Sequence, residues 1–173
     1  MSWQRIVVVM GALLATTGAT AACGDDPQPA APGTATATTG SRENATAEKG
    51  REAVVKRKCV ECHGDNMAGA TTPLKNQPNP LVELYPPNLT PDFEFGLGDP
   101  ASTDPAKKGY TDDLLARAIR QGYDRDDQTL CPQMKHFAEM TDFEVYSIVK
   151  YLRSLPPVKL KIPRSVCPPL KSK

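Results

Sequence analysis

The chain of 173 residues has the length of one ordinary domain with additional segments. Hydrophobic residues make up 39% of it, below the roughly 45–50% of globular chains, and its 17 prolines are about twice the average share. Part of the chain is therefore linker or long structured loop. Lys and Arg total 21 against 20 Asp and Glu, which argues against nucleic acid as a partner. No second long apolar run follows the N-terminal one, and this excludes a multi-span membrane protein.

Residues 1–22 have the order of an export signal: a short start with one cation, an apolar stretch and an end of small residues. The end, Thr20-Ala21-Ala22-Cys23, resembles the lipobox of bacterial lipoproteins, although Thr20 stands where that motif has an aliphatic residue. An ordinary cleaved signal and an uncleaved single anchor are the alternatives to a lipid on Cys23. Each places the rest of the chain outside the cytoplasm. We expect it on the periplasmic side of a bacterial membrane, anchored by lipid or, without acylation of Cys23, soluble in the periplasm.

Composition divides the rest of the chain into three parts. Residues 23–45 are rich in Pro, Ala and Thr without hydrophobic periodicity, and they are predicted to be a disordered tether. Residues 46–158 are predicted to form the folded domain. Residues 159–173 are a basic, proline-rich tail.

Within the domain, helical spacing predicts three helices and no alternating strand, hence an all-α fold. The first helix covers about residues 46–61, and its cations are interpreted as a solvated face. The second runs from the cap Thr111 to the stop signal Gly122, and the third follows the capping-box pattern Thr141-Asp142-Phe143-Glu144. Residues 64–110 form a proline-rich loop. A loop of that length needs an organiser other than secondary structure, such as a large apolar cofactor.

The segment Cys59-Val60-Glu61-Cys62-His63 carries the strongest chemical signal, because C-x-x-C-H is the attachment signature of c-type haem. Two thiols near the end of a helix can add to the two vinyl groups of one porphyrin, and the next histidine is then the proximal iron ligand. A thioredoxin-like redox pair would need a strand-to-helix context that the sequence lacks. A zinc site could recruit Cys131, Cys167 or His136, but no second C-x-x-C exists. We therefore predict one covalent haem c.

The second axial position of the iron decides the chemistry, and Met134 is the favoured ligand. It lies in the proline-constrained loop Leu130-Cys131-Pro132-Gln133-Met134, which could cross the distal face of the haem. Met67 follows the proximal histidine by only four residues and can hardly reach the opposite face. Met140 directly precedes the capping box, where an apolar residue serves as a helix staple. His136 is the alternative, and it would give bis-histidine ligation.

Together these segments resemble a single-haem class I cytochrome c, particularly bacterial periplasmic members and cytochrome subunits of dehydrogenases. The resemblance covers essentially residues 46–158, and it includes Pro87-Asn88-Leu89-Thr90-Pro91 as well as the haem motif. It implies a small fold of three main helices and long loops wrapped around one covalent haem, with Gly50 packed against Tyr151. It also implies a haem pocket lined by the segment after residue 86, with Pro87, Asn88 and Leu89 as cofactor-binding residues.

Each of the five cysteines can be given a role. With Cys23 assigned to lipid and with Cys59 and Cys62 assigned to haem, Cys131 and Cys167 are left over. In an oxidising compartment two remaining cysteines favour a disulfide over two free thiols. This bridge would pin the C-terminal tail beside the loop of the distal ligand.

The predicted function is the transfer of single electrons between a donor and an acceptor redox protein, by an iron whose axial positions stay filled. It needs no enzyme activity and no small-molecule substrate. One alternative is a haem protein with a displaceable sixth ligand that acts as a peroxidase or gas sensor. This alternative needs a weakly bound Met134 and a distal polar group such as His136. The other is a fixed cytochrome subunit of a dehydrogenase complex, which uses the same chemistry with a permanent partner.

Overall fold

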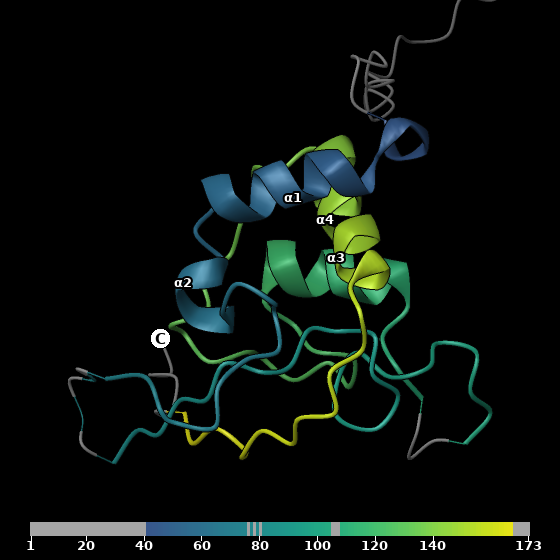
Figure 1. The fold of residues 1–173 in the computed structure, drawn as a ribbon. Helices are drawn as coiled ribbons and strands as arrows, with labels where there is room; N and C mark the ends of the chain where they lie inside the picture. The colour runs from purple at the N-terminus through teal and green to yellow at the C-terminus, as the bar shows by residue number, and fades with distance from the viewer. Residues whose placement is uncertain (1–40, 76, 78, 80, 105–107, 168–173) are drawn as a thin grey trace, which may run out of the picture. The chain divides into compact units, whose positions relative to one another are not determined.

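A computed structural model of the chain describes residues 41–75, 77, 79, 81–104 and 108–167. The predicted export signal, Cys23 and the tether up to residue 40 lie outside them. The described residues form helices and three isolated β-bridges but no strand, so the all-α class is confirmed. In this part of the chain no helix combines the length and the apolar character that crossing a membrane requires. In chain order the elements are η1 (Arg42–Asn44), α1 (Ala47–Lys56), α2 (Val60–His63), α3 (Asp112–Gln121) and α4 (Asp142–Ser154) (Figure 1).

Helices α1 and α4 cross in direct contact, and α3 packs against α4 (Figure 1). Helix α1 begins where Thr46 Oγ1 accepts a hydrogen bond from the Lys49 N–H. The crossing is close because Gly50 has no side chain. A Cβ atom there would overlap the Ser147 carbonyl and lie 2.7 Å from Tyr151 Cβ. The expected packing of Gly50 against Tyr151 is therefore confirmed.

The first helix ends earlier than the sequence predicts. One helix is expected over residues 46–61, whereas α1 stops at Lys56. Lys58 adopts a left-handed backbone conformation, with φ at 62°, which an α-helix cannot continue through. The chain then restarts as α2, a separate turn that contains Cys62 and is preceded by Cys59 at its N-cap position.

The other helices begin and end at their predicted signals. Thr111 caps the first turn of α3 with its side-chain oxygen, and α3 ends at Gly122, whose φ of 72° is left-handed. Thr141 Oγ1 accepts a hydrogen bond from the Glu144 N–H. The second half of the predicted capping box differs, because both oxygens of the Glu144 carboxylate bind the guanidinium of Arg57.

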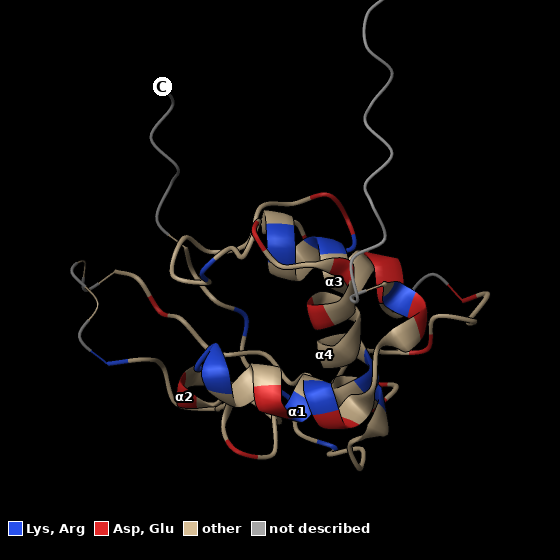
Figure 2. Ribbon diagram, turned by 90° about the horizontal axis from the view of Figure 1, so that it is seen from above, with Lys and Arg blue, Asp and Glu red and all other residues tan. Residues whose placement is uncertain are grey.

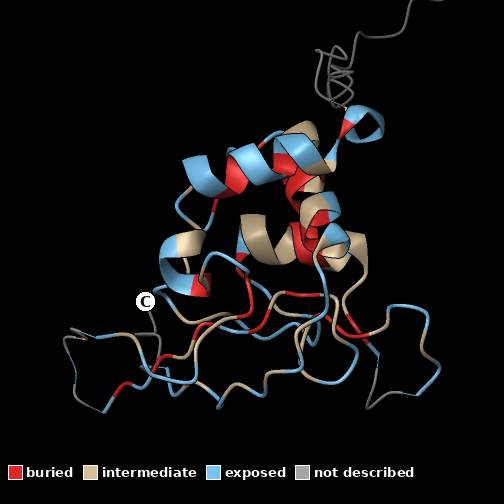
Figure 3. Cartoon of the chain, in the orientation of Figure 1, coloured by how far each residue is buried: buried red, intermediate tan, exposed pale blue. Residues whose placement is uncertain are grey.

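The core lies where the long helices face one another, as the burial colouring shows (Figure 3). Loop residues contribute to it as well as helical ones, so the loops are part of the packed domain. The core consists of Ala53, Val54, Met67, Leu97, Leu115, Ala116, Phe137, Met140, Val145, Ile148, Val149 and Leu152.

The folded domain starts a few residues before its predicted boundary at residue 46. Arg42 of η1 forms an ion pair of 2.7 Å with Asp113 at the start of α3. Ala45 is only 4% exposed, and its carbonyl accepts a hydrogen bond of 2.8 Å from Lys150 Nζ. Residues 41–45 therefore belong to the domain and not to the predicted tether.

Charged residues on the surface of the described part are of mixed sign. Acidic and basic residues alternate along α1 (Figure 2), and Lys49 pairs with Glu52 there. Lys58 pairs with Glu61 in the same way. Helix α1 therefore offers no surface of a single sign.

Candidate haem site

Helix α2 and its N-cap residue Cys59 present the three chemical groups of the motif on one turn. The His63 N–H donates to the Cys59 carbonyl at 3.0 Å, so spacings of three and four residues place Cys59, Cys62 and His63 on one face. Both cysteines are free thiols, Cys59 half-buried and Cys62 exposed. Burial raises the pKa of the Cys59 thiol, which therefore keeps its proton at neutral pH.

His63 is the most constrained residue of the motif. It is 6% exposed, and its Nδ1 lies 3.1 Å from the Pro87 carbonyl oxygen. Because a carbonyl oxygen only accepts hydrogen bonds, Nδ1 carries the proton and Nε2 keeps its lone pair. Burial lowers the pKa of His63 and the bond to Pro87 opposes this effect, so the neutral ring is favoured. A neutral imidazole with a fixed tautomer is what an iron ligand requires.

Two loop segments place the Pro87 carbonyl at His63. Residues 64–70 and 86–89 lie side by side and are joined by two backbone hydrogen bonds. The Ala70 N–H donates to the Pro86 carbonyl at 3.1 Å, and the Leu89 N–H donates to the Met67 carbonyl at 2.8 Å. Gly69 stands between them with φ at 76°, and a Cβ atom on it would overlap carbonyl oxygens of the second segment. The close approach therefore requires glycine at this position.

The polar side chains after Pro87 are buried and fully bonded. Asn88 Oδ1 accepts from the Thr90 N–H at 3.0 Å and from Thr90 Oγ1 at 2.8 Å. Asn88 Nδ2 donates to the carbonyls of Val158 at 2.7 Å and Leu160 at 3.3 Å. Leu89 packs on the core. That Pro87, Asn88 and Leu89 line a haem stays a prediction, and of the three it is Pro87 that contacts His63.

Residues 130–137 form what we call the Met134 loop. Its two end residues donate backbone hydrogen bonds of 2.7 Å and 3.1 Å to the carbonyls of Gly122 and Ile119, so both ends lie at the C-terminal end of α3. Met134 is half-buried, and its N–H donates to the Cys131 carbonyl at 2.9 Å. The side chain that the sequence favours as distal ligand is thus carried by a loop with fixed ends.

The other candidates for the second iron ligand are packed against the rest of the domain. The ring of His136 covers Gly122, where a Cβ atom would overlap its Nε2. Met67 and Met140 are 1% and 4% exposed in the core. Among the methionines of the described residues, only Met134 lies outside the buried core.

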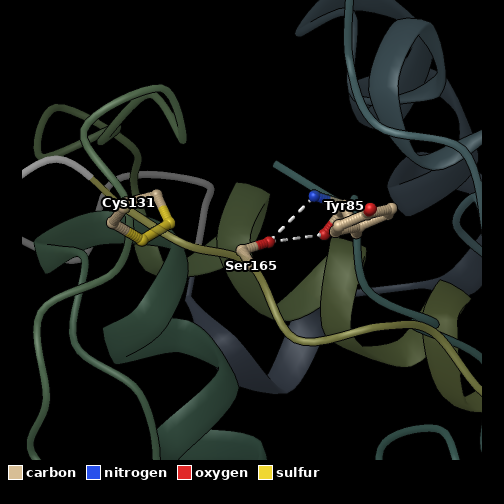
Figure 4. The surroundings of a disulfide bond; sticks show 4 residues. Tyr85, Cys131 and Ser165 are labelled. Carbon is tan, nitrogen blue, oxygen red and sulfur yellow. Dashed lines mark hydrogen bonds between the residues drawn. A yellow bond between two sulfur atoms is a disulfide. The ribbon is translucent and has the colours of Figure 1, made fainter. Parts of the chain in front are cut away.

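Cys131 and Cys167 are joined by a disulfide, with their Cα atoms 5.3 Å apart (Figure 4). The structure thus brings together the two cysteines left over by the sequence count. Neither is then available to a zinc ion. Within the described ranges no three His, Cys, Asp or Glu side chains gather closely enough to hold a metal ion. The zinc alternative therefore has no ligand set in this part of the chain.

The sequence interpretation missed an ion-pair cluster beside the motif. Arg57 is expected on a solvated face, but its side chain is only 20% exposed and binds Glu144 with bonds of 2.7 Å and 2.8 Å. It also pairs with Glu139 at 2.8 Å and lies 5.6 Å from the ring centre of Phe137. The cluster joins the haem motif to the Met134 loop and to α4. No local pattern announces it, because the two acidic partners are 82 and 87 residues away.

The arrangement fits covalent haem attachment. Two free thiols and a buried histidine lie on one turn, and the Pro87 carbonyl leaves Nε2 of that histidine free to bind iron. Fold and site thus define a c-type haem protein. The chain belongs to the cytochrome c family, whose model matches residues 47–156. It is an electron-transfer protein of the class I fold that binds haem c covalently.

Several curated proteins are similar to the chain. It is 29% identical over 126 residues to a nicotinate dehydrogenase subunit of Pseudomonas putida, a match that covers 72% of the chain and 10% of that protein. It is 30% identical over 125 residues to the cytochrome c subunit of alcohol dehydrogenase (quinone) from Gluconacetobacter polyoxogenes and from Komagataeibacter europaeus. These matches cover 69% of the chain and 24% of each subunit. The chain thus spans about a quarter or less of the length of these relatives.

Proposed function

We propose that the chain carries single electrons between redox proteins through one haem c, with His63 and Met134 as axial ligands. The observation that carries this proposal is the buried His63, whose Nδ1 is committed to Pro87 and whose Nε2 is free. When bound, the haem supplies an iron that alternates between the ferric and ferrous states. Cys59 and Cys62 would hold the porphyrin by two thioethers.

The residues around His63 keep its ring in one orientation. The hydrogen bond from Nδ1 to the Pro87 carbonyl holds the imidazole in place and raises its basicity as a ligand. The paired segments 64–70 and 86–89 hold that carbonyl, so the ligand need not rearrange when the charge on the iron changes. A site that rearranges little suits an electron carrier.

Two observations support Met134 as the distal ligand. Its side chain lies outside the core, whereas Met67 and Met140 fill core positions. The ring of His136 is packed on Gly122 at the end of α3. A thioether ligand raises the reduction potential relative to a second histidine, which suits acceptance of electrons from a dehydrogenase.

We further propose that the protein is exported, anchored through a lipid on Cys23 and served by a dehydrogenase as electron donor. The export signal and the Thr20-to-Cys23 pattern support the location. The relatives support the donor, because their names are those of dehydrogenase subunits. In this role the chain has no substrate of its own and catalyses no reaction.

The ligand assignment is tested with the full chain, expressed in a host that attaches haem c. We expect a mass increase of one haem that survives acid–acetone extraction, and a weak far-red band in the ferric spectrum. Met134→Leu should abolish that band, whereas the matched variant His136→Leu should keep it. A band that disappears in His136→Leu alone, or protein without pigment, would overturn the assignment.

A second measurement separates an electron carrier from a ligand-binding haem protein. We expect the ferrous protein to leave carbon monoxide unbound at neutral pH, because Met134 occupies the sixth position. Rapid binding of carbon monoxide by the unmodified protein would instead support the peroxidase or gas-sensor alternative. Co-purification of the chain with a dehydrogenase distinguishes a fixed subunit from a free carrier.

A further inference from the structure

The segment after α4 is bound along its length to the loop that holds His63. We call residues 158–167 the strap and residues 83–90 the proximal loop. The strap lies beyond the segment that matches the cytochrome c family, which ends at residue 156. It runs beside the proximal loop in the lower part of the domain, coloured yellow next to teal in Figure 1.

The hydrogen bonds between the two segments follow an antiparallel register. The Val158 N–H donates to Thr90 Oγ1 at 3.0 Å. Ser165 Oγ accepts from the Tyr85 N–H at 2.8 Å and donates to the Tyr85 carbonyl at 3.1 Å (Figure 4). The N–H of Val166, the next residue of the strap, donates to the Glu83 carbonyl at 2.7 Å. The strap is therefore fixed at both ends of the proximal loop.

Part of the contact between strap and proximal loop is buried, so water cannot take the place of its hydrogen bonds. Asn88 and Thr90 are 4% and 0% exposed. The side-chain amide of Asn88 donates to two strap carbonyls, and its oxygen accepts two hydrogen bonds from Thr90. A change in register would leave these buried polar groups without partners, which is unfavourable. The strap therefore has one position on the proximal loop.

The far end of the strap is bonded to the Met134 loop. Cys167 forms the disulfide with Cys131, which lies three residues before Met134 and accepts its backbone hydrogen bond. Four of the residues around Met134 are exposed. They are Pro132, Gln133, Lys135 and His136.

We propose that the strap is a positioning element for the distal ligand: its disulfide holds the Met134 loop, and its hydrogen bonds hold the loop that carries the His63 partner. The proposal rests on the proposed function, since it takes Met134 as the sixth ligand. By tethering Cys131, the strap limits the distance that the loop can move from the haem. It thereby lowers the fraction of molecules in which the sixth position is open.

The test is imidazole binding to the ferric holoprotein. Imidazole binds only when Met134 has left the iron, so its apparent affinity reports the open fraction. Replacement of both Cys131 and Cys167 by Ser should raise the apparent imidazole affinity about tenfold or more, because a disulfide constrains a loop strongly. Ser165→Ala should raise it by a smaller factor, about threefold. Ser154→Ala, which loses one exposed serine bond at the end of α4, is the matched control and should leave it unchanged.

A Met134→Leu background separates positioning from general loosening. Its sixth position is already open, so removal of the disulfide should change imidazole affinity there by less than about twofold. Equal affinities of the unmodified protein and the double-cysteine variant would overturn the strap proposal. If the double-cysteine variant does not fold, Ser165→Ala against Ser154→Ala decides. A far-red band in the unmodified protein shows that the proposed function stands in either case, and its absence overturns both proposals.

Discussion

The two sides of the proposed haem site, His63 and Met134, are held by different kinds of structure. On the His63 side, the ligand, its Pro87 partner and the network around Asn88 are buried, and backbone hydrogen bonds join residues 64–70 to 86–89. On the other side, four of the eight residues of the Met134 loop are exposed, and two backbone bonds, one disulfide and the buried Phe137 hold it. Burial fixes the first side, whereas the second side depends in addition on a covalent bond to a distant segment. Changes on the first side should therefore impair folding and haem attachment, whereas changes on the second should lower stability without loss of haem and should loosen the distal ligand.

The largest effect is expected from Gly69→Ala on the His63 side. The new Cβ would overlap the facing carbonyl oxygen, and alanine would also have to adopt a φ of 76°. The two penalties together should lower the free energy of unfolding by about 3 kcal/mol or more. Urea titration and the yield of haem-loaded protein measure this effect.

Gly64→Ala is the matched control for that substitution. Gly64 has nearly the same φ, 75°, but the nearest atom to a new Cβ is 3.6 Å away. Only the conformational penalty applies, but with ψ at 164° Gly64 lies in a region that is nearly exclusive to glycine, so the loss should be about 1–3 kcal/mol and smaller than at Gly69. Equal losses at the two positions would show that the contact between the paired loops is not what holds this side.

The second largest effect is expected from replacement of Cys131 and Cys167 by Ser on the Met134 side. The bridge spans 36 residues, and its removal should lower the free energy of unfolding by about 2–4 kcal/mol. The amount of covalent haem per protein should stay the same, because Cys59, Cys62 and His63 are held without the bridge. Loss of haem attachment in this variant would contradict the independence of the two sides.

Arg57 joins the two sides, and Arg57→Met should have an intermediate effect. The substitution keeps most of the side-chain volume but leaves the Glu144 carboxylate, 19% exposed, without its cation. We expect a loss of about 1–2 kcal/mol at neutral pH. Because Glu139 and Phe137 belong to the Met134 side, imidazole affinity should also rise slightly.

The same ion pair predicts a dependence of stability on pH. The hydrogen bond from Arg57 is the main reason why the pKa of Glu144 lies below its ordinary value of 4.5. A carboxyl group with a lowered pKa in the folded state stabilises the protein above its ordinary pKa and loses this contribution as pH falls through the lowered one. The difference between unmodified protein and Arg57→Met should therefore be constant near neutral pH and shrink below about pH 4.5. A difference that stays constant in acid would contradict the role of Glu144.

The sequence predicts those features whose signals are local. The motif residues from Cys59 to His63 are contiguous, and the caps Thr111 and Thr141 lie directly before their helices, so short patterns were enough. The disulfide followed from counting cysteines in a chain predicted to be exported. The break at Lys58 could not be predicted, because no glycine or proline marks it.

Features that depend on distant partners gave no signal in the sequence. Arg57 looks like any other cation of a helix, and its burial depends on acidic residues more than eighty positions away. The contact of Asn88 with the strap likewise joins residues 70 and 72 positions apart. Residues 41–45 are too short and polar for periodicity to reveal their packing against α3 and α4.

The smallest expected effect is at Lys58, on the His63 side. Its φ of 62° is unfavourable for lysine and acceptable for asparagine, whose short polar side chain tolerates the left-handed region. Lys58→Asn should raise the free energy of unfolding by about 0.5 kcal/mol, and Lys58→Val should lower it by about 1 kcal/mol or more. Both variants lose the ion pair between Lys58 and Glu61. Because these two side chains are 73% and 61% exposed, the pair contributes little to stability. Opposite signs in urea titrations would assign the effect to the backbone at the junction of α1 and α2. Equal losses would assign it to the missing ammonium group and would show that this junction is not under conformational tension.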